Sequence, residues 1–589
     1  MPNFDILIRN GWIVDGTGAP MRRGSIGVRG ERIAAVGDIH HADAETVIDA
    51  EGLVVCPGFI DAHSHADKTL PLFPRAENYV MQGVTTTVGG NCGNTIAPIL
   101  DWWPPNMFWD SDIIFELRPY QYYSEELLPA DEVKAKIQEI YGVELAWGSF
   151  HEFLDWMKDV GISVNHAPMV GHNTIRAQVM GQDWKREPSQ GELEEMKGLV
   201  REAMEAGAFG LSTGLDYPPG AYADTQEIIE LVKVVKEFGG IYATHWRRTG
   251  PRRAGATPPI NKIRGIREAI EIGRKTGVQV QLSHLSAGYT IYPQPPPRVL
   301  EEAAVKATLK VIDEALADGV SIFFDIIPNV TGGTLTSPYL ASLLTPWLRV
   351  AGSREALAKA LRMGDFREEV KSAIQAGKWY WLNPAVNPFW SRLVRVIDCG
   401  VKEFVGKTLS QIAEEMGKDD LEALFEVLVR DPEAKMQSLG DKTDFEKAAF
   451  LRHSNCMVGL DTYTFDGRWA MKHPPYYLPH PNTYGGMPRY LRRYVREMKV
   501  LTLEEAIHKI TQLPAETFHI RDRGVLRPGA YADIVIFDPS RVREASTPLE
   551  PRRPPIGIHH VIVNGVVTVR DGSHTGARPG RILRLHGKA

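Results

Sequence analysis

Eight short apolar runs, separated by amphipathic stretches, constrain the fold of this chain more than any other feature. The runs lie at residues 54–63, 84–92, 162–171, 208–214, 240–246, 278–285, 320–327 and 456–461. The segments 191–207 and 225–240 between them have the apolar spacing of surface helices. Alternation of buried strands with helices is typical of a parallel sheet covered by helices. Eight such units favour a TIM-type (β/α)8 barrel over an open sheet, which the pattern alone also allows.

The two ends of the chain have a different character. Residues 1–57 and 523–589 contain short strand-like runs that are split by Gly, Asn and Asp, which is typical of hairpins. We expect both ends to build one small β-domain, with the barrel at residues 58–522. Long gaps between the apolar runs predict insertions into the barrel near residues 97–160 and 328–455.

The bulk composition argues against several classes of partner. The net charge of -6 is small for 589 residues, so nothing favours nucleic acid or an anionic membrane surface. No window approaches the roughly 20 apolar residues of a membrane span, and the N-terminus does not resemble a signal peptide. Four scattered cysteines favour free thiols in a reducing, cytoplasmic setting over a disulfide framework. The composition is compatible with a homo-oligomer.

Side chains that can bind metals stand at the ends of five of the eight apolar runs. These residues are His63 at the end of the first run and His65 two residues beyond it, Cys92 in the second run, His245 in the fifth, His284 in the sixth and Asp461 in the eighth. In a TIM barrel the carboxyl ends of all strands meet at one face, so these side chains would converge. Imidazole, thiolate and carboxylate together suit zinc. One such residue alone is usually incidental, but six of them predict a metal site.

Several motifs resemble the N-acyl-D-amino-acid deacylase (D-aminoacylase) family of the amidohydrolase superfamily. They are "PGFIDAHSHAD", "GVTTTVGGNCG", "GLSTGLDYPPG", "YATHWR", "LSHLSAG", "GLD" and "MPRYLRRYVRE", and they follow the family's order from about residue 3 to residue 575. The "GNCG" element sets this branch apart from hydantoinase and dihydroorotase relatives, in which a carboxylated lysine bridges the metals. The resemblance implies a TIM barrel with a small β-sandwich domain formed from both chain ends.

The resemblance also implies a role for each candidate ligand. The residues that match a tightly bound zinc ion are Cys92, His245 and His284. His63 and His65 match a pair that, with Asp461, forms a second and weaker metal position. Asp461 also matches the family's general base. Zinc lowers the pKa of bound water to roughly 7, and Asp461 would accept the water proton and pass it to the leaving nitrogen.

Three positions depart from the family where it binds the carboxylate of its substrate. Ser286 replaces a lysine, Asn482 replaces an arginine, and Asn329 is nearest to the position of a tyrosine. Charge-assisted hydrogen bonds are worth about 1.5–3 kcal/mol each, so losing three partners should abolish recognition of a free amino-acid carboxylate. Arg247, which the family shares, and Tyr217 in "GLDYPPG" are further candidates for contact with the substrate.

We therefore expect a zinc-dependent amidohydrolase that cleaves the C–N bond of a small, neutral and apolar N-acyl amide, anilide or carbamate. The alternatives are an N-acyl-D-amino-acid deacylase with a rearranged carboxylate site and a cyclic-amide hydrolase of hydantoinase type. The cysteine of "GNCG", and the lack of a lysine ending the fourth run, disfavour the hydantoinase type.

An aromatic-rich stretch at residues 102–123 predicts either an apolar lid or wall of the pocket, or a structural segment that forms an oligomer contact or a loop packed on the barrel. Its aromatic residues are Trp102, Trp103, Phe108, Trp109, Tyr120, Tyr122 and Tyr123. The sequence gives both interpretations equal weight.

Overall fold

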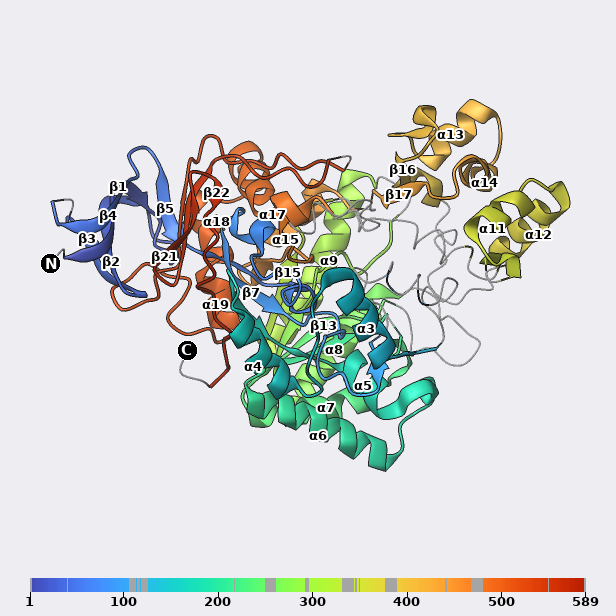
Figure 1. The fold of residues 1–589 in the computed structure, drawn as a ribbon, viewed down its shortest axis with the longest axis horizontal. Coiled ribbons are helices and arrows are strands. Elements are labelled where there is room, and N and C mark those ends of the chain that lie inside the picture. Colours follow the sequence, from blue (N-terminus) through green and yellow to red (C-terminus); the bar gives the residue numbers. More distant parts are fainter. Residues whose placement is uncertain are drawn as a thin grey trace.

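The protein has a small β-domain at one end, a barrel in the middle and a helical insertion at the other end (Figure 1). The structure is a computed structural model. It describes residues 3–39, 41–104, 126–216, 218–248, 261–291, 296–330, 350–376, 389–439, 442–467, 480–548 and 550–586, together with Ile113, Leu117, Leu344, Trp347 and Leu348. No helix among the described residues is long and apolar enough to cross a membrane.

The barrel is built from parallel strands in two sheets, with the orders β10-β7-β6 and β11-β12-β13-β14-β15-β18. The strands are β6 (Phe59–Asp61), β7 (Val84–Gly89), β10 (Asn165–Pro168), β11 (Val170–Gly171), β12 (Gly210–Gly214), β13 (Ile241–His245), β14 (Gln279–Leu282), β15 (Ile322–Ile326) and β18 (Cys456–Val458). Only Met169 separates β10 from β11, which links the two sheets. At the other seam the Ala62 amide donates to the Val458 carbonyl at 3.4 Å. All eight predicted runs therefore supply barrel strands, which confirms the TIM-type fold.

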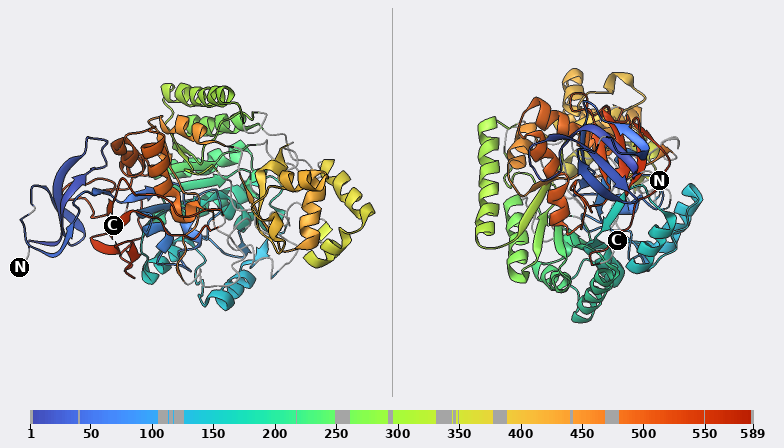
Figure 2. Two further views of the ribbon diagram at one scale, coloured as in Figure 1. Left: turned by 90° about the horizontal axis from the view of Figure 1, so that it is seen from above. Right: turned by 90° about the vertical axis from the view of Figure 1, so that its left-hand side faces the viewer.

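Helices cover the outside of the barrel, and α6, α7, α15 and α18 begin at a residue whose side chain caps the first turn. In α7 the buried stripe includes Ile228, Leu231 and Val235, and the Asp224 side chain accepts from the Glu227 amide at the first turn. Both views in Figure 2 show the green helices α8 and α9 outside the strands. The barrel-side helices are α1 (Glu77–Val80), α5 (His172–Met180), α6 (Gln190–Ala206), α7 (Thr225–Glu237), α8 (Lys262–Thr276), α9 (Arg298–Ala317), α15 (Asp444–Leu451), α17 (Asn482–Tyr490), α18 (Leu503–Lys509) and α19 (Gln512–Thr517).

Strands from both chain ends form one nine-stranded sheet, with the order β22-β21-β20-β19-β5-β1-β2-β3 and β4 paired to β1. The strands are β1 (Phe4–Ile13), β2 (Arg22–Arg29), β3 (Arg32–Gly37), β4 (Ala44–Asp49), β5 (Val54–Pro57), β19 (Ile534–Phe537), β20 (Ile558–Val563), β21 (Val566–Arg570) and β22 (Ser573–His574). Ile8, Val28 and Ile562 lie in its apolar core. This confirms a small β-domain built from both ends. The run 54–63 is two strands, since the chain passes from β5 into the barrel strand β6 at Gly58.

Both long gaps contain extra structure. The described part of the first gap holds β8 (Trp102–Trp103), β9 (Leu128–Pro129), α3 (Ala130–Tyr141) and α4 (Phe150–Val160). The second holds α11 (Arg354–Ala360), α12 (Gly364–Gln375), β16 (Val394–Asp398), α13 (Leu409–Met416), α14 (Asp420–Arg430) and β17 (Lys435–Ser438). Leu361, Leu424 and Phe425 belong to an apolar core separate from that of the barrel. The chain leaves the barrel for this unit after β15, hence at the carboxyl end of the strands.

His166 on β10 makes folding stability depend on pH. Burial lowers the pKa of its imidazole to about 3, while Thr87 Oγ1 lies 2.9 Å from Nδ1. In the unfolded chain a histidine binds a proton near pH 6.5, so His166 contributes stability above that pH and loses it as the pH falls toward 3. Between pH 7 and pH 5 the unfolding free energy of the wild type should fall by about 2 kcal/mol more than that of His166→Gln, because the variant has no imidazole to protonate on unfolding.

Urea unfolding at both pH values measures this difference. His151→Gln on the exposed side of α4 serves as the control and should follow the wild type. If the unfolding free energies of the wild type and His166→Gln depend on pH in the same way, His166 is not a buried neutral imidazole.

Candidate metal centre

All six candidate ligands lie together at the carboxyl end of the barrel strands. Their donor atoms form two groups, each with every donor within 4.8 Å of the others: His63, His65, Cys92 and Asp461 in the first, and Cys92, His245 and His284 in the second. Cys92 belongs to both groups. Five strands supply these residues, namely β6, β7, β13, β14 and β18.

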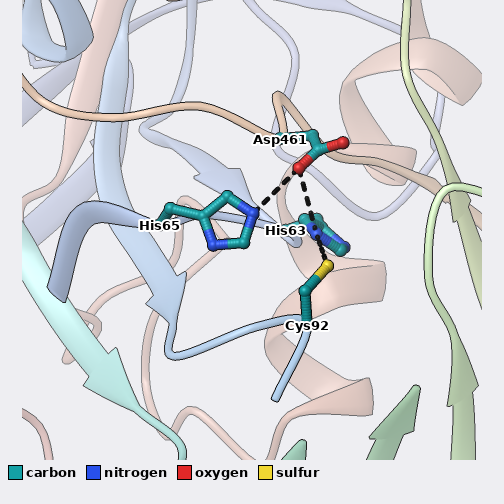
Figure 3. Close-up of side chains that lie close together, drawn as sticks. All are labelled: His63, His65, Cys92 and Asp461. Atoms are coloured by element: carbon teal, nitrogen blue, oxygen red, sulfur yellow. Dashed lines mark hydrogen bonds and ion pairs between the residues drawn. The ribbon is translucent and has the colours of Figure 1, made fainter. Parts of the chain in front are cut away.

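The first group is centred on one carboxylate oxygen (Figure 3). Asp461 Oδ1 lies 3.0 Å from His65 Nε2 and 3.4 Å from His63 Nε2, and His63 Nε2 lies 3.4 Å from Cys92 Sγ. The Asp461 side chain is 32% exposed, whereas the His63 side chain is fully buried. Solvent can therefore reach the group at Asp461.

The second group is arranged around the Cys92 sulfur. Cys92 Sγ lies 3.7 Å from His245 Nδ1 and 3.6 Å from His284 Nε2. Zinc bonds of about 2.0–2.3 Å in tetrahedral geometry separate neighbouring donors by about 3.3–3.8 Å. Both distances fall in this range, and so does the distance from Cys92 Sγ to His63 Nε2. The donor types and spacings therefore fit zinc.

Three of the six residues have positive backbone φ angles, which L-residues rarely adopt. The angles are 57° at Cys92, 38° at His284 and 52° at Asp461. The His284 amide donates to Asp325 Oδ2 at 2.9 Å, and the Asp461 amide donates to the His63 carbonyl at 2.8 Å. The Gly93 amide beside Cys92 donates to Ser212 Oγ at 3.0 Å. Such conformations cost about 1–3 kcal/mol each, and these contacts hold them.

Electrostatics favour the metal-binding forms of the sulfur and the carboxylate. Burial raises the pKa of the Cys92 thiol, but positive charge on His63 and hydrogen bonds to His245 and His284 outweigh burial and hold the pKa well below its usual value. For Asp461, burial likewise raises the pKa, while His63 and His65 bring it well below the usual range. Thiolate and carboxylate are the forms that bind metal ions.

The histidines differ in charge. Burial lowers the pKa of His63, but the negative charges of Cys92, Asp325 and Asp461 outweigh burial and raise it well above its ordinary value. Burial and the neighbouring His245 lower the pKa of His284 to about 4, so this imidazole is neutral. Because a metal binds only neutral imidazole, ion binding at His63 must release a proton.

Three acidic residues at the site were not anticipated from the sequence. Asp325 Oδ1 lies 3.5 Å from His63 Nδ1, and it is the only charged residue in the apolar run 320–327, which is the signal that could have identified it. Asp61 Oδ1 accepts from the amides of His63 and Leu460. Asp216, two residues beyond β12, lies beside His245.

The expected carboxylate-binding positions lie around the site in different surroundings. Ser286 is buried, and it lines a small cavity together with Lys262, Glu301, Lys442 and Glu446. Asn482 is also buried, and its Nδ2 donates to the carbonyl of Leu460, the residue before Asp461, at 3.3 Å. Asn329 is half-buried beyond the end of β15, and Tyr217 lies outside the described residues.

Arg247 is surrounded by acceptors from its own fold. Its Nε donates to Glu268 Oε2 at 3.0 Å, and its terminal nitrogens donate to the carbonyls of Ala221 at 3.1 Å and Ala223 at 2.8 Å. The Arg247 side chain is 2% exposed. These contacts bind the cation within the fold, which argues against Arg247 as the partner of a substrate carboxylate.

The start of the aromatic stretch packs on the barrel. Trp103 is buried in the barrel core, and the amide and carbonyl of Trp102 bond to the Gln178 side chain. For these two residues the structure favours the packed loop over the lid. Phe108, Trp109, Tyr120, Tyr122 and Tyr123 lie outside the described residues.

Zinc binding should depend most on the donor that both groups share. We expect Cys92→Ala to weaken zinc binding by more than about 100-fold, since even partners that only support a ligand are worth 10–100-fold. His65→Ala removes a donor from one group and should leave zinc in the other. Competition with a chromogenic chelator measures both dissociation constants, with Cys399→Ala in the insertion core as the buried-cysteine control. If Cys92→Ala leaves the zinc affinity unchanged, Cys92 is not a ligand common to both groups.

Comparisons with known proteins place the chain in a family. The sequence profile of the Amidohydrolase family matches residues 46–236 and 475–569. D-aminoacylase of Alcaligenes xylosoxydans xylosoxydans is 32% identical over 98% of this chain and 97% of its own length. Two solved structures superpose on 99% of this chain with a TM-score of 0.70.

One of these structures is N-acyl-D-glutamate deacylase from Bordetella bronchiseptica with zinc and a phosphonate mimic of the tetrahedral intermediate, 29% identical over 99% of its length. The other concerns the binuclear metal centre of a D-aminoacylase, with one-metal activation and second-metal attenuation, and is 30% identical over 100% of its length. The family that the motifs predicted is thereby confirmed. This chain belongs to the N-acyl-D-amino-acid deacylase family of the amidohydrolases, and it is a metal-dependent hydrolase of non-peptide C–N bonds in linear amides.

Proposed function

We propose that this protein is a zinc-dependent hydrolase of small, neutral, apolar N-acyl amides, anilides or carbamates. The observation that carries the proposal is the convergence of six zinc-type donors in two groups that share Cys92. In the proposal Cys92, His245 and His284 hold a tightly bound ion. His63, His65 and Asp461 provide a second, weaker position beside it.

Asp461 carries the proton transfers in this proposal. Zinc bound by these residues would supply a Lewis acid that polarises the amide carbonyl and makes water nucleophilic near neutral pH. The low pKa keeps Asp461 ionised, so that it can accept the proton of the attacking water. Figure 3 shows its second oxygen directed away from both imidazoles. Protonated Asp461 then donates to the leaving nitrogen, which departs as a neutral amine.

The surroundings of Ser286 support a neutral substrate. The cavity that Ser286 lines contains two lysines and two glutamates, so its charged side chains sum to zero. Glu446 Oε1 accepts from the Ala287 amide at 3.1 Å, which places one of the carboxylates beside the chain that leads from His284. Burying a substrate carboxylate without a surplus cation would cost several kcal/mol.

An N-acyl-D-amino-acid deacylase with a rearranged carboxylate site is the second candidate. Lys262 and Lys442 line the same cavity as Ser286, and either ammonium group could take the place of the family's lysine. The hydantoinase-type alternative has less support, because β12 (Gly210–Gly214) has the sequence GLSTG and supplies no lysine.

The cellular setting that we propose is the cytoplasm. All four cysteines are buried free thiols, which persist in a reducing compartment. The partner in this proposal is a small-molecule amide.

Asp461→Asn tests the role of the general base. An amide in this position cannot accept the water proton, so kcat should fall by about 10²–10⁴-fold. The tight position lacks Asp461, so at least one zinc ion per chain should remain by metal analysis. Asp313→Asn, an exposed carboxylate paired with His453, serves as the control and should retain wild-type kcat. Full activity of Asp461→Asn would exclude this mechanism.

Substrate choice separates the two candidates. The kcat/KM for a neutral N-acetyl anilide should exceed that for N-acetyl-D-amino acids by at least about 100-fold, the equivalent of two missing charge-assisted hydrogen bonds. Ser286→Lys should lower the ratio of these two kcat/KM values, because it restores a cation for the substrate carboxylate. Faster turnover of the acids would support the deacylase, and Lys262→Ala or Lys442→Ala would then raise KM for the acids alone.

A further inference from the structure

His245 is contacted on both sides of its imidazole ring. Its Nδ1 lies 3.7 Å from Cys92 Sγ, and its Nε2 lies 3.3 Å from Asp216 Oδ2. Both side chains of the His245–Asp216 pair are 3% exposed. A carboxylate beside one ring nitrogen keeps the proton on that nitrogen and leaves the other nitrogen with its lone pair. The contact therefore selects the tautomer that offers Nδ1 to an ion at Cys92.

Asp216 is itself held in place by the chain that follows His245. Its Oδ1 accepts from the Arg248 amide at 2.8 Å, and its Oδ2 lies 3.6 Å from Arg248 Nε. The Leu215 amide donates to the His245 carbonyl at 3.0 Å. These bonds connect the carboxyl ends of β12 and β13, which are neighbours in the sheet. The carboxylate is consequently fixed before any ion binds.

The other histidines of the two groups are held differently. His63 Nδ1 lies 3.5 Å from Asp325 Oδ1 and makes no hydrogen bond in the described part of the chain. The Nδ1 atoms of His65 and His284 are buried with no hydrogen-bond partner in the described part of the chain. His245 differs from the other three histidines. A carboxylate, that of Asp216, is hydrogen-bonded to its ring nitrogen on the side away from Cys92.

We propose that Asp216 is a positioning residue that orients His245 and fixes its Nε2-protonated tautomer, so that Nδ1 binds the ion held with Cys92 and His284. The inference rests on the proposed zinc site. It assigns a purpose to the aspartate of "GLDYPPG", which the resemblance left without one. Partners of this kind typically contribute 10–100-fold to metal affinity.

The test is the zinc dissociation constant of the full-length protein, measured by chelator competition. Asp216→Ala should weaken zinc binding by about 10–100-fold, and Asp216→Asn, which keeps a neutral acceptor, should weaken it less. Asp216→Glu should recover part of the affinity. In the Co²⁺-substituted protein, Asp216→Ala should shift the visible absorption bands, because the geometry at His245 changes.

Glu227→Gln is the matched control. Glu227 is as buried as Asp216 and is paired with His172 and Arg176, but it contacts none of the six donors. This variant should lower the melting temperature of the metal-free protein while leaving the zinc dissociation constant unchanged. Circular dichroism of the metal-free Asp216 variants shows whether they are folded. If Asp216→Ala does not fold, the zinc dissociation constant of Asp216→Asn is used for the test.

The outcomes separate the inference from the proposed function. A wild-type protein that binds no zinc overturns the proposed function, and this inference with it. A wild type that binds zinc, together with folded Asp216→Ala of the same affinity and Co²⁺ spectrum, overturns the positioning role alone. Weaker binding in Asp216→Ala with unchanged binding in Glu227→Gln supports it.

Discussion

The left-handed backbone at Cys92, His284 and Asp461 is the constraint on which the rest of the site depends. A barrel strand that continued in regular geometry would alternate its side chains between the interior and the helices. A turn with positive φ just beyond the strand redirects the side chain toward the centre of the face. Donors from five strands can therefore meet in two groups, each with its donors within 4.8 Å of one another. Such conformations persist only where the surrounding structure over-determines them, and the rigid barrel provides that support.

The strands that give no donor provide support for those that do. The strand β12 leads to Asp216 beside His245, and β15 carries Asp325 between His63 and the amide of His284. The strand β11 leads into Thr174, whose amide donates to the carbonyl of Gly93 next to Cys92. Nearly every barrel strand thus takes part either in binding or in orientation. Several ionisable groups can be buried together here, because the negative charges of Cys92, Asp325 and Asp461 surround the imidazole of His63.

The fold and the inner donors could be predicted because their signals are local. Barrel strands are buried on both faces and therefore appear as apolar runs, and each donor interrupts such a run at its end. Asp216 could not be predicted in the same way, since its importance depends on the pairing of β12 with β13 in space. The surroundings of Arg247 could not be predicted from its motif, because Glu268, which accepts from Arg247 Nε, lies on the helix that follows. The surroundings of Ser286 include Lys442, more than 150 residues away, which no motif could indicate.

The helical insertion has its own apolar core, at the opposite end of the molecule from the sheet that joins the chain termini (Figure 1). A unit of this kind can unfold and refold locally as a separate cooperative unit while the barrel strands stay paired. Substitutions in its core would change its own stability and leave the turns that carry the donors unaltered. Metal chemistry and the unit formed by α11, α12, β16, α13, α14 and β17 are therefore free to diverge at different rates during evolution, because they draw on different cores.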